Sequence, residues 1–414
     1  MNRPGPPAGH LSPGLLVVLG LLMTANPLGV GMYLPALSGI ADDLDVTIAQ
    51  AQLLFTGFML GIAVGQLIVG MLSDALGRRR VLLVGLAVLT VATALVTVAP
   101  DIGVLLVLRI VQGLGAAASV VVARAVVSDL VRGPQADRAY SILMGMLAAG
   151  PFAAPLVGTL LLQLGGWRAI FLGMTGIFLV YLGAAWLMVP ETLAPARRTP
   201  LRARSLLSNY ARLLRDRRYV ANALSMAFAF AALSVHSSAS SFVTQDLLGA
   251  DEWGFTAIYM AYAVAIMSGS MINASLAVRF GAARLMLWSQ AVSVLACAAL
   301  VLFATVGPFT LATFTITVLI GGVATSAVLA NASALTLARA GFAAASGAAL
   351  MGALQFATAS AASPIGGVLG THTGVPMALG MLGCTLISAM AAVLAHRAGG
   401  AARAPAAPGL PDPV

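Results

Sequence analysis

The sequence predicts an all-α polytopic membrane protein, and two observations support that prediction. Hydrophobic residues make up 60% of the 414 residues and charged residues 8%, against roughly 45–50% and 25% in soluble globular chains. Twelve apolar runs are each long enough for a helix that crosses a bilayer, which takes about 20 residues. The runs are too long and too evenly apolar for barrel strands, so we expect helices.

The predicted spans fall into two groups of six. They cover approximately residues 15–36, 51–72, 80–100, 104–127, 139–162, 168–189, 219–243, 254–276, 284–304, 308–330, 343–369 and 375–395. The longest hydrophilic stretch, 190–218, separates the groups and is predicted to be a cytoplasmic linker with an interfacial amphipathic helix at 205–217. We therefore expect bundles at 1–189 and 219–397, and a disordered cytoplasmic tail at 398–414.

Arginine placement predicts the orientation. The chain has no lysine, and its arginines fall in alternate loops, with a dense set at 197–218. The intervening loops carry acids and one arginine, Arg168. Because positive loops stay inside, both termini are expected in the cytoplasm, beneath a bacterial inner membrane. The net charge of +9 then follows from topology and indicates no nucleic-acid partner, since the arginines form no basic face.

The first apolar run is predicted to remain in the protein as a span. No small-residue cleavage site follows it, and eleven further runs do. Its most polar group is Asn26.

The turn between the second and third spans is the strongest local signal. It reads GMLSDALGRRR from Gly70 to Arg80. Gly77 suits a tight turn, and Asp74 and Arg78 flank it closely enough to pair. A positive cytoplasmic loop with one acid is the simpler interpretation.

The junction of the eighth and ninth spans repeats this pattern weakly. Gly281 aligns with Gly77, and Arg284 with Arg80. A match at equivalent junctions of two six-span halves indicates duplication, as in transporters built from repeats.

Arg109 lies inside the fourth span. An unpaired guanidinium in hydrocarbon is costly, so we expect it to face the bundle interior or water. Gln112 shares its helix face. The alternative is an arginine that reaches the outer surface.

The fifth span contains GPFAAPLVG from Gly150 to Gly158. Pro151 and Pro155 remove backbone donors and are expected to bend the helix. Gly150, Ala154 and Gly158 form a small-residue stripe. Simple helix packing explains this pattern equally well.

His236 lies in the seventh span among several serines. An imidazole can exchange protons near physiological pH, which makes it a candidate proton carrier. A serine-lined outer vestibule around a non-coupling histidine is the alternative.

These strings resemble motifs of the major facilitator superfamily. The turn resembles its loop signature G-x-L-x-D-R-x-G-R-R, with Ala75 replacing an arginine, and RIVQG resembles its fourth-helix motif R-x-x-Q-G. GPFAAPLVG resembles the family's antiporter motif, with departures at Ala154 and Thr159. The resemblance implies a major facilitator fold, with twelve transmembrane helices in two pseudo-symmetric six-helix bundles.

The resemblance also implies roles for particular residues. The loop signature and the acid that completes it would latch the cytoplasmic side: Gly70, Asp74, Gly77, Arg78, Arg79 and Asp129. Arg109 and Gln112 would take part in proton coupling, and the antiporter motif would comprise Gly150, Pro151, Pro155 and Gly158. Spans that line the family's cavity hold the substrate-contact candidates Asn26, Tyr33, Met144, Phe230, Asn331 and Gln355.

Further strings resemble the Bcr/CflA group of bacterial drug-resistance exporters, which are drug:proton antiporters. They are MYLPAL from Met32, GQL from Gly65, ARAVVSD from Ala123, GWRAIF from Gly166 and PET from Pro190. The resemblance spans the N-terminal half and is thinner afterwards. In that group an aspartate usually precedes MYLP and carries the proton, whereas this chain has Gly31.

We therefore expect a monomeric exporter of small amphipathic or apolar drug-like compounds, coupled to protons, without a cofactor or metal. The alternative on the same fold is a facilitator or uptake carrier for a small polar metabolite. A membrane enzyme is disfavoured because the sequence contains no nucleophile elbow, clustered metal ligands or P-loop.

Overall fold

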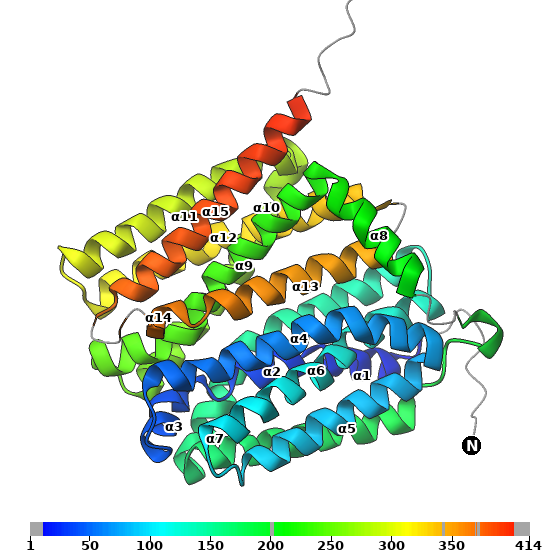
Figure 1. Cartoon of the computed structure of the whole chain (residues 1–414), viewed down its shortest axis with the longest axis horizontal. Helices are drawn as coiled ribbons and strands as arrows, with labels where there is room; N and C mark the ends of the chain where they lie inside the picture. The colour runs from blue at the N-terminus through cyan, green and yellow to red at the C-terminus, as the bar shows by residue number, and fades with distance from the viewer. Residues whose placement is uncertain (1–10, 199–202, 342–343, 369, 371–372, 401–414) are drawn as a thin grey trace, which may run out of the picture.

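The computed structural model describes residues 11–198, 203–341, 344–368, 370 and 373–400, and these are almost entirely helical (Figure 1). Most of the predicted tail, 401–414, lies outside the described residues. The last helix, α15 (Val375–Gly400), continues past 398, where the tail was predicted to begin.

The N-terminal half begins with a broken span. Its helices are α1 (Pro13–Met23), α2 (Ala25–Gly31), η1 (Leu34–Ala36), α3 (Leu37–Asp43), α4 (Ile48–Leu76), α5 (Arg78–Val96), α6 (Ile102–Leu130) and α7 (Pro134–Met188). Pro27 and Pro35 lack the amide hydrogens that would continue one helix from α1 to α3. The first span is consequently interrupted after Met23 and again after Gly31.

The C-terminal half follows a short segment that contains η2 (Pro195–Arg197) and α8 (Ala203–Arg215). Its helices are α9 (Arg217–Phe242), η3 (Val243–Leu247), α10 (Glu252–Phe280), α11 (Ala282–Thr305), α12 (Leu311–Arg339), α13 (Ala344–Ala362), α14 (Ile365–Val368) and α15. The predicted linker helix is present as α8, shifted by two residues from its expected bounds.

Eleven segments within the described ranges are long and apolar enough to cross a membrane. One of them, α7, contains 55 residues and reverses direction where Gly165 and Gly166 have non-helical backbone angles. It therefore supplies two crossings, and the twelve predicted spans are all present. The predicted fold class is confirmed, while the limits of the bundles as domains remain a prediction.

Figure 1 shows the two bundles side by side, with α1–α7 on one side and α9–α15 on the other. Hydrogen bonds between described residues join the bundles in the half farther from the chain termini. Five such bonds are Thr56–Ser363 (2.8 Å), Ser360 to the Thr56 carbonyl (3.0 Å), Thr159–Thr256 (2.6 Å), Ser38 to Asp246 (2.9 Å) and Gln245 to the Pro35 carbonyl (3.3 Å). The structure is thus closed on this side.

Glycines bring α4 and α6 into close contact. A Cβ at Gly61 would clash with the Ile110 carbonyl, and one at Gly113 would clash with the Phe58 carbonyl. The backbones therefore approach each other directly, as small residues allow between membrane helices. This contact fixes the position of Arg109, which lies one turn before Gly113 on α6.

Candidate functional site

The turn between α4 and α5 depends on Gly77. Its φ of 101° and ψ of 150° lie in a region that is almost restricted to glycine. A Cβ at Gly77 would also clash with the Glu191 carboxylate. Gly70, by contrast, has no atom within 4 Å of the position where its Cβ would stand, so packing does not require glycine there.

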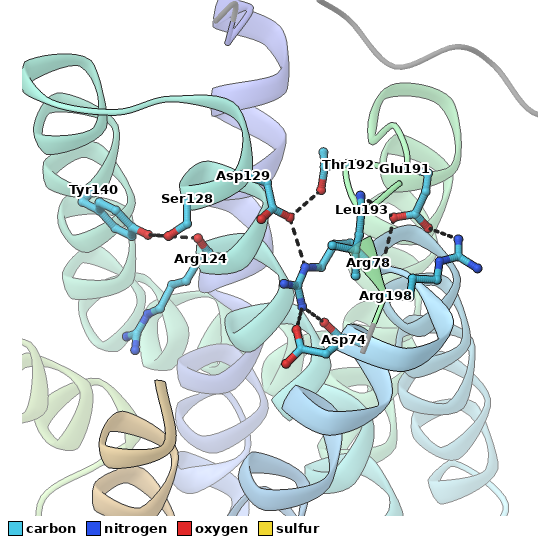
Figure 2. Close-up of polar contacts among 11 residues, drawn as sticks. Asp74, Arg78, Arg124, Ser128, Asp129, Tyr140, Glu191, Thr192, Leu193 and Arg198 are labelled. Atoms are coloured by element: carbon cyan, nitrogen blue, oxygen red, sulfur yellow. Dashed lines mark hydrogen bonds and ion pairs between the residues drawn. The ribbon is translucent and has the colours of Figure 1, made fainter. Parts of the chain in front are cut away.

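Arg78 is the centre of a charged network at this turn, which Figure 2 shows. Its Nη1 lies 2.5 Å from Asp74 Oδ1, and its Nε donates to Asp129 Oδ2 at 3.1 Å. Its backbone N–H donates to Glu191 Oε1 at 2.9 Å, and the Thr192 hydroxyl donates to Asp129 at 2.9 Å. One arginine thereby joins α4, α6 and the segment that follows α7.

Burial strengthens part of this network. The side chains of Arg78 and Asp129 are 13% and 17% exposed, whereas that of Asp74 is 50% exposed. Charge-assisted hydrogen bonds are stronger when water is excluded. The bond to Asp129 should therefore contribute more to stability than the bond to Asp74, which solvent screens.

Arg79 points to a different neighbour. It donates to the Trp186 carbonyl at 2.7 Å, and its guanidinium lies 5.4 Å from the centre of the Trp186 ring. Arg79 therefore binds the end of α7 and takes no part in the carboxylate network.

Glu191 and Thr192 were not predicted as site residues. Their signal in the sequence is PET at 190–192, which resembles the Bcr/CflA group but does not itself indicate a contact with the turn. Glu191 accepts from the backbone of Arg78 and of Leu193, and lies 3.8 Å from Arg198. The segment after α7 is thus tied to the turn by its own carboxylate.

Arg109 is fully buried in the N-terminal bundle, so it does not reach the outer surface. Its Nη2 donates to the Gly29 carbonyl at 3.0 Å, and its Nε donates to the Leu54 carbonyl at 3.2 Å. Its Nη1 donates to Gln112 Oε1 at 2.9 Å, and Gln112 donates to Thr93 at 2.9 Å. A hydrogen-bonded chain therefore runs from α2 through α6 to α5.

The break in the first span helps to accommodate this charge. Gly29 lies in the last turn of α2, where carbonyls lack helical partners and the helix dipole favours a cation. The guanidinium also lies 4.4 Å from the centres of the Tyr33 and Phe58 rings, which attract a cation. Among the described residues no carboxylate forms an ion pair with Arg109.

The small residues of α7 pack against α2. A Cβ at Gly150 would clash with Pro27, and one at Gly158 would clash with the Met32 carbonyl. Between them, a Cβ at Gly31 would lie 2.8 Å from the Cβ of Ala154.

The two prolines of α7 lie within this contact region. The only residues of α7 with non-helical backbone angles are Gly165 and Gly166, so the helix continues through Pro151 and Pro155. Pro155 is buried, and Pro151 is partly exposed.

His236 on α9 lies among aromatic side chains of α10 and α12. The ring is almost fully buried, with Tyr262 4.2 Å, Phe314 6.0 Å and Tyr259 6.4 Å away between ring centres. Neither ring nitrogen has a hydrogen-bond partner among the described residues. The nearby Ser234 donates to the Phe230 carbonyl rather than to the imidazole.

The substrate-contact candidates occupy different environments. Asn26 and Tyr33 are buried and carry unpaired oxygens, while Asn331 is bonded to Asn273 at 2.6 Å. Met144 is exposed, Gln355 is partly buried, and Phe230 packs on Phe356 with ring centres 5.4 Å apart.

Among the described residues, further unpaired buried polar atoms that were not predicted belong to Gln52, Ser119, Asn222 and Arg198. Buried polar groups usually have partners, so each unpaired one is a candidate for a ligand or water contact. Their positions in the sequence gave no signal, because isolated Gln, Ser and Asn residues occur throughout the spans. No group of three His, Cys, Asp or Glu side chains within the described ranges could hold a metal ion.

Known proteins resemble the chain over nearly its whole length. The profile of the Major Facilitator Superfamily matches residues 19–359. An uncharacterized MFS-type transporter of Bacillus subtilis, YdgK, is 33% identical over 392 residues, which are 93% of this chain and 96% of that protein. A bicyclomycin resistance protein homolog of Haemophilus influenzae is 28% identical over 379 residues, 91% of this chain and 94% of that protein.

A solved transporter structure has a fold similar to that of this chain. The bacterial homolog of the human lysosomal transporter Spinster, in an inward-facing and occupied conformation, aligns with a TM-score of 0.69 at 15% identity. The alignment covers 93% of this chain and 96% of that chain, so it includes both bundles.

Proposed function

The chain belongs to the major facilitator superfamily, and on this premise we propose that it exports small amphipathic or apolar drug-like compounds by alternating access. The relative named as a bicyclomycin resistance protein homolog supports this substrate class. In this proposal the protein lies in a bacterial cytoplasmic membrane with both termini in the cytoplasm, and proton entry drives export.

The observation that carries the proposal is the position of the hydrogen bonds between the bundles, which among the described residues lie at one end. Hydrogen bonds such as Thr56–Ser363 and Thr159–Thr256 close the half away from the termini. The Arg78 network at the opposite end joins elements of the N-terminal half to one another. Alternating access requires contacts that close one side at a time around a central site. By the proposed topology, this structure is closed to the outside.

The interior favours an apolar substrate. Among the described residues, the unpaired buried polar atoms belong to a small number of side chains, such as Asn26, Tyr33 and Ser119. Sparse hydrogen-bonding groups among Phe and Met side chains suit adaptable binding of apolar compounds. A polar metabolite would need several convergent donors and acceptors.

Proton coupling in this proposal depends on Arg109 and Gln112. An arginine keeps its proton, so Arg109 can contribute only by changing partners between states. Its acceptors, Gly29 and Leu54, lie on α2 and α4, and a rearrangement of either helix would alter them. His236 is a weaker candidate, because aromatic rings enclose it and no polar partner reaches it.

Transport by purified protein in proteoliposomes tests the proposal. A pH gradient of either sign would be imposed with a phenicol, bicyclomycin or a lipophilic cationic dye as the substrate. We expect movement against the drug gradient that a protonophore abolishes, and its loss in Arg109→Ala at matched abundance. Movement only down the drug gradient would indicate a facilitator. Stimulated entry of a sugar or amino acid would indicate an uptake carrier.

A further inference from the structure

Helices α9 and α15 pack side by side, and a groove between them has arginines at one end. A cavity of about 500 Å³ opens at the end nearest the chain termini. Arg217 and Arg397 contribute to its wall, together with the apolar side chains of Leu214, Leu224 and Leu394. The groove therefore combines positive charge with an apolar surface.

Both arginines are available to a ligand. Their side chains are exposed, and neither side chain makes a hydrogen bond or an ion pair with another described residue. The adjacent acid, Asp216, is already bound by Arg339 at 2.7 Å. Two positive charges at the mouth of the groove are thus left without a counter-charge.

The apolar part of the groove continues toward the middle of the bilayer. A second cavity of about 400 Å³ lies between α15 and the segment of α13 and α14, and Phe228 of α9 and Ile387 of α15 also line it. Phe228 lies one helical turn from Leu224 of the first cavity, and Ile387 lies one turn from Ala391. The two cavities therefore adjoin along the same faces of α9 and α15. From Ile387 to Arg397 the helix rises about 15 Å, which is about half the thickness of the hydrocarbon core.

We infer that this groove binds one anionic phospholipid. Its phosphate lies between Arg217 and Arg397, and its acyl chains follow Leu224 and Leu394 toward Phe228. Guanidinium groups bind phosphate through charge-assisted hydrogen bonds, and basic pockets between membrane helices select anionic headgroups. A free phosphate would leave the apolar wall unused, whereas an apolar drug would leave the arginines unpaired.

The lipid would also contact the segment between the bundles. Leu214 belongs to α8 and is 52% exposed, and α8 packs on α9 and α13. A lipid seated against Leu214 and Arg217 therefore supports the position of α8 beside the C-terminal bundle.

Retention of lipid by the purified full-length protein tests this inference without depending on transport. The protein would be delipidated in detergent, then given phosphatidylglycerol or phosphatidylcholine with the same acyl chains, and bound lipid would be counted by native mass spectrometry. We expect one tightly retained phosphatidylglycerol and at least about tenfold weaker retention of phosphatidylcholine, as for the loss of charged hydrogen bonds. Equal retention of the two lipids would overturn the inference.

Variants separate the charge from the apolar wall. The double variant Arg217→Ala/Arg397→Ala should lose phosphatidylglycerol, whereas Arg217→Lys/Arg397→Lys should keep most of it. Leu394→Trp, which fills the groove and keeps both charges, should also lose the lipid. The exposed Arg284 on α11 provides the matched control, because Arg284→Ala removes a charge away from the groove. Unchanged retention in the double alanine variant, with normal folding, would contradict the site.

Discussion

The turn at Gly77 and the turn at Gly281 have the same backbone but different surroundings. Gly77 has φ 101° and ψ 150°, and Gly281 has φ 81° and ψ 141°. Each ends one span and begins the next. Around Gly77 lie Asp74, Arg78 and Glu191, whereas nothing lies within 4 Å of where a Cβ at Gly281 would stand.

This difference separates what the repeated backbone provides from what the side chains provide. The equivalents of Asp74 and Arg78 by alignment on the glycines are Val278 and Ala282, and Val278 is 90% exposed. The same turn can therefore exist without a charged network. The backbone of the turn therefore does not require the charged network of the N-terminal half. We propose that this network controls the opening between the bundles.

The largest expected effect comes from removing one charge of the network. We expect Asp74→Asn to lower export by about tenfold while the protein still inserts, because Arg78 loses one of its two carboxylates. Hydrogen bonds to charged groups contribute about 1.5–3 kcal/mol. Asp74 is half exposed, so the lower end of this free-energy range applies. That value corresponds to about a tenfold change in the equilibrium between the two conformations of alternating access. Export at matched membrane abundance measures it.

Val278→Asn is the control for Asp74→Asn. It places the same amide at the equivalent position of the other turn, where no network exists, and should leave export unchanged. Equal export by Asp74→Asn and wild type would remove the proposed role of the network.

Alanine at the two glycines tests the comparison directly. Both substitutions force a side chain into backbone geometry that costs about 1–3 kcal/mol. Only Gly77→Ala also displaces the Glu191 carboxylate. The loss of that contact adds to the backbone strain, so export should fall by roughly tenfold. Gly281→Ala should lower the melting temperature yet retain most export. Equal losses of export in the two variants would show that strain alone matters.

The coupling prediction concerns the interior of the N-terminal bundle. Restoring an acid with Gly31→Asp should create or steepen the dependence of export on pH. The structure adds a condition, because a Cβ at Gly31 would lie 2.8 Å from that of Ala154. We therefore expect the single variant to disturb the contact of α2 with α7, and the double variant Gly31→Asp/Ala154→Gly to accept the carboxylate.

The pH profile of export distinguishes these variants. The double variant should respond to pH more steeply than wild type, while Ala154→Gly alone should not differ from it. An unchanged profile in a folded, active double variant would mean that position 31 does not influence coupling.

Features that depend on local composition were predictable from the sequence. The spans, the glycine turn and the pairing of Asp74 with Arg78 follow from hydropathy and from residues close in the chain. The interior position of Arg109 follows from the cost of a charge in lipid. These inferences need no knowledge of which helices are neighbours.

Features that depend on distant partners were not predictable. Glu191 reaches the backbone of Arg78 across 113 positions, and no local pattern specifies that contact. Asn331 stays a substrate-contact candidate, and the hydrogen bond of its amide to Asn273 on another helix has no signal in the local sequence. The role of Ala154 opposite Gly31 likewise emerges only when α7 is packed against α2.

The smallest expected effect concerns the charge pair of the C-terminal half. Asp216 accepts hydrogen bonds from the backbone of Arg218 and Tyr219 at the start of α9 and binds Arg339 at the end of α12. Burial would raise the pKa of Asp216, but hydrogen bonds from Arg339 and from the two backbone groups outweigh it and hold the pKa below its usual range. Neither Asp216 nor Arg339 belongs to the Arg78 network, so we expect this pair to stabilise the fold without controlling transport.

The sign of its pH dependence follows from the lowered pKa. Because the folded state favours the charged form, the stabilisation is present above the ordinary pKa near 4 and is lost as the pH falls through the lower folded value. Asp216→Asn keeps a helix cap and loses the ion pair, so it should cost about 0.5 kcal/mol at pH 7 and leave export intact. The difference in melting temperature between the variant and wild type should shrink toward pH 3. A constant difference across that range, or a loss of export, would place Asp216 in the gating machinery and would end the contrast between the two halves.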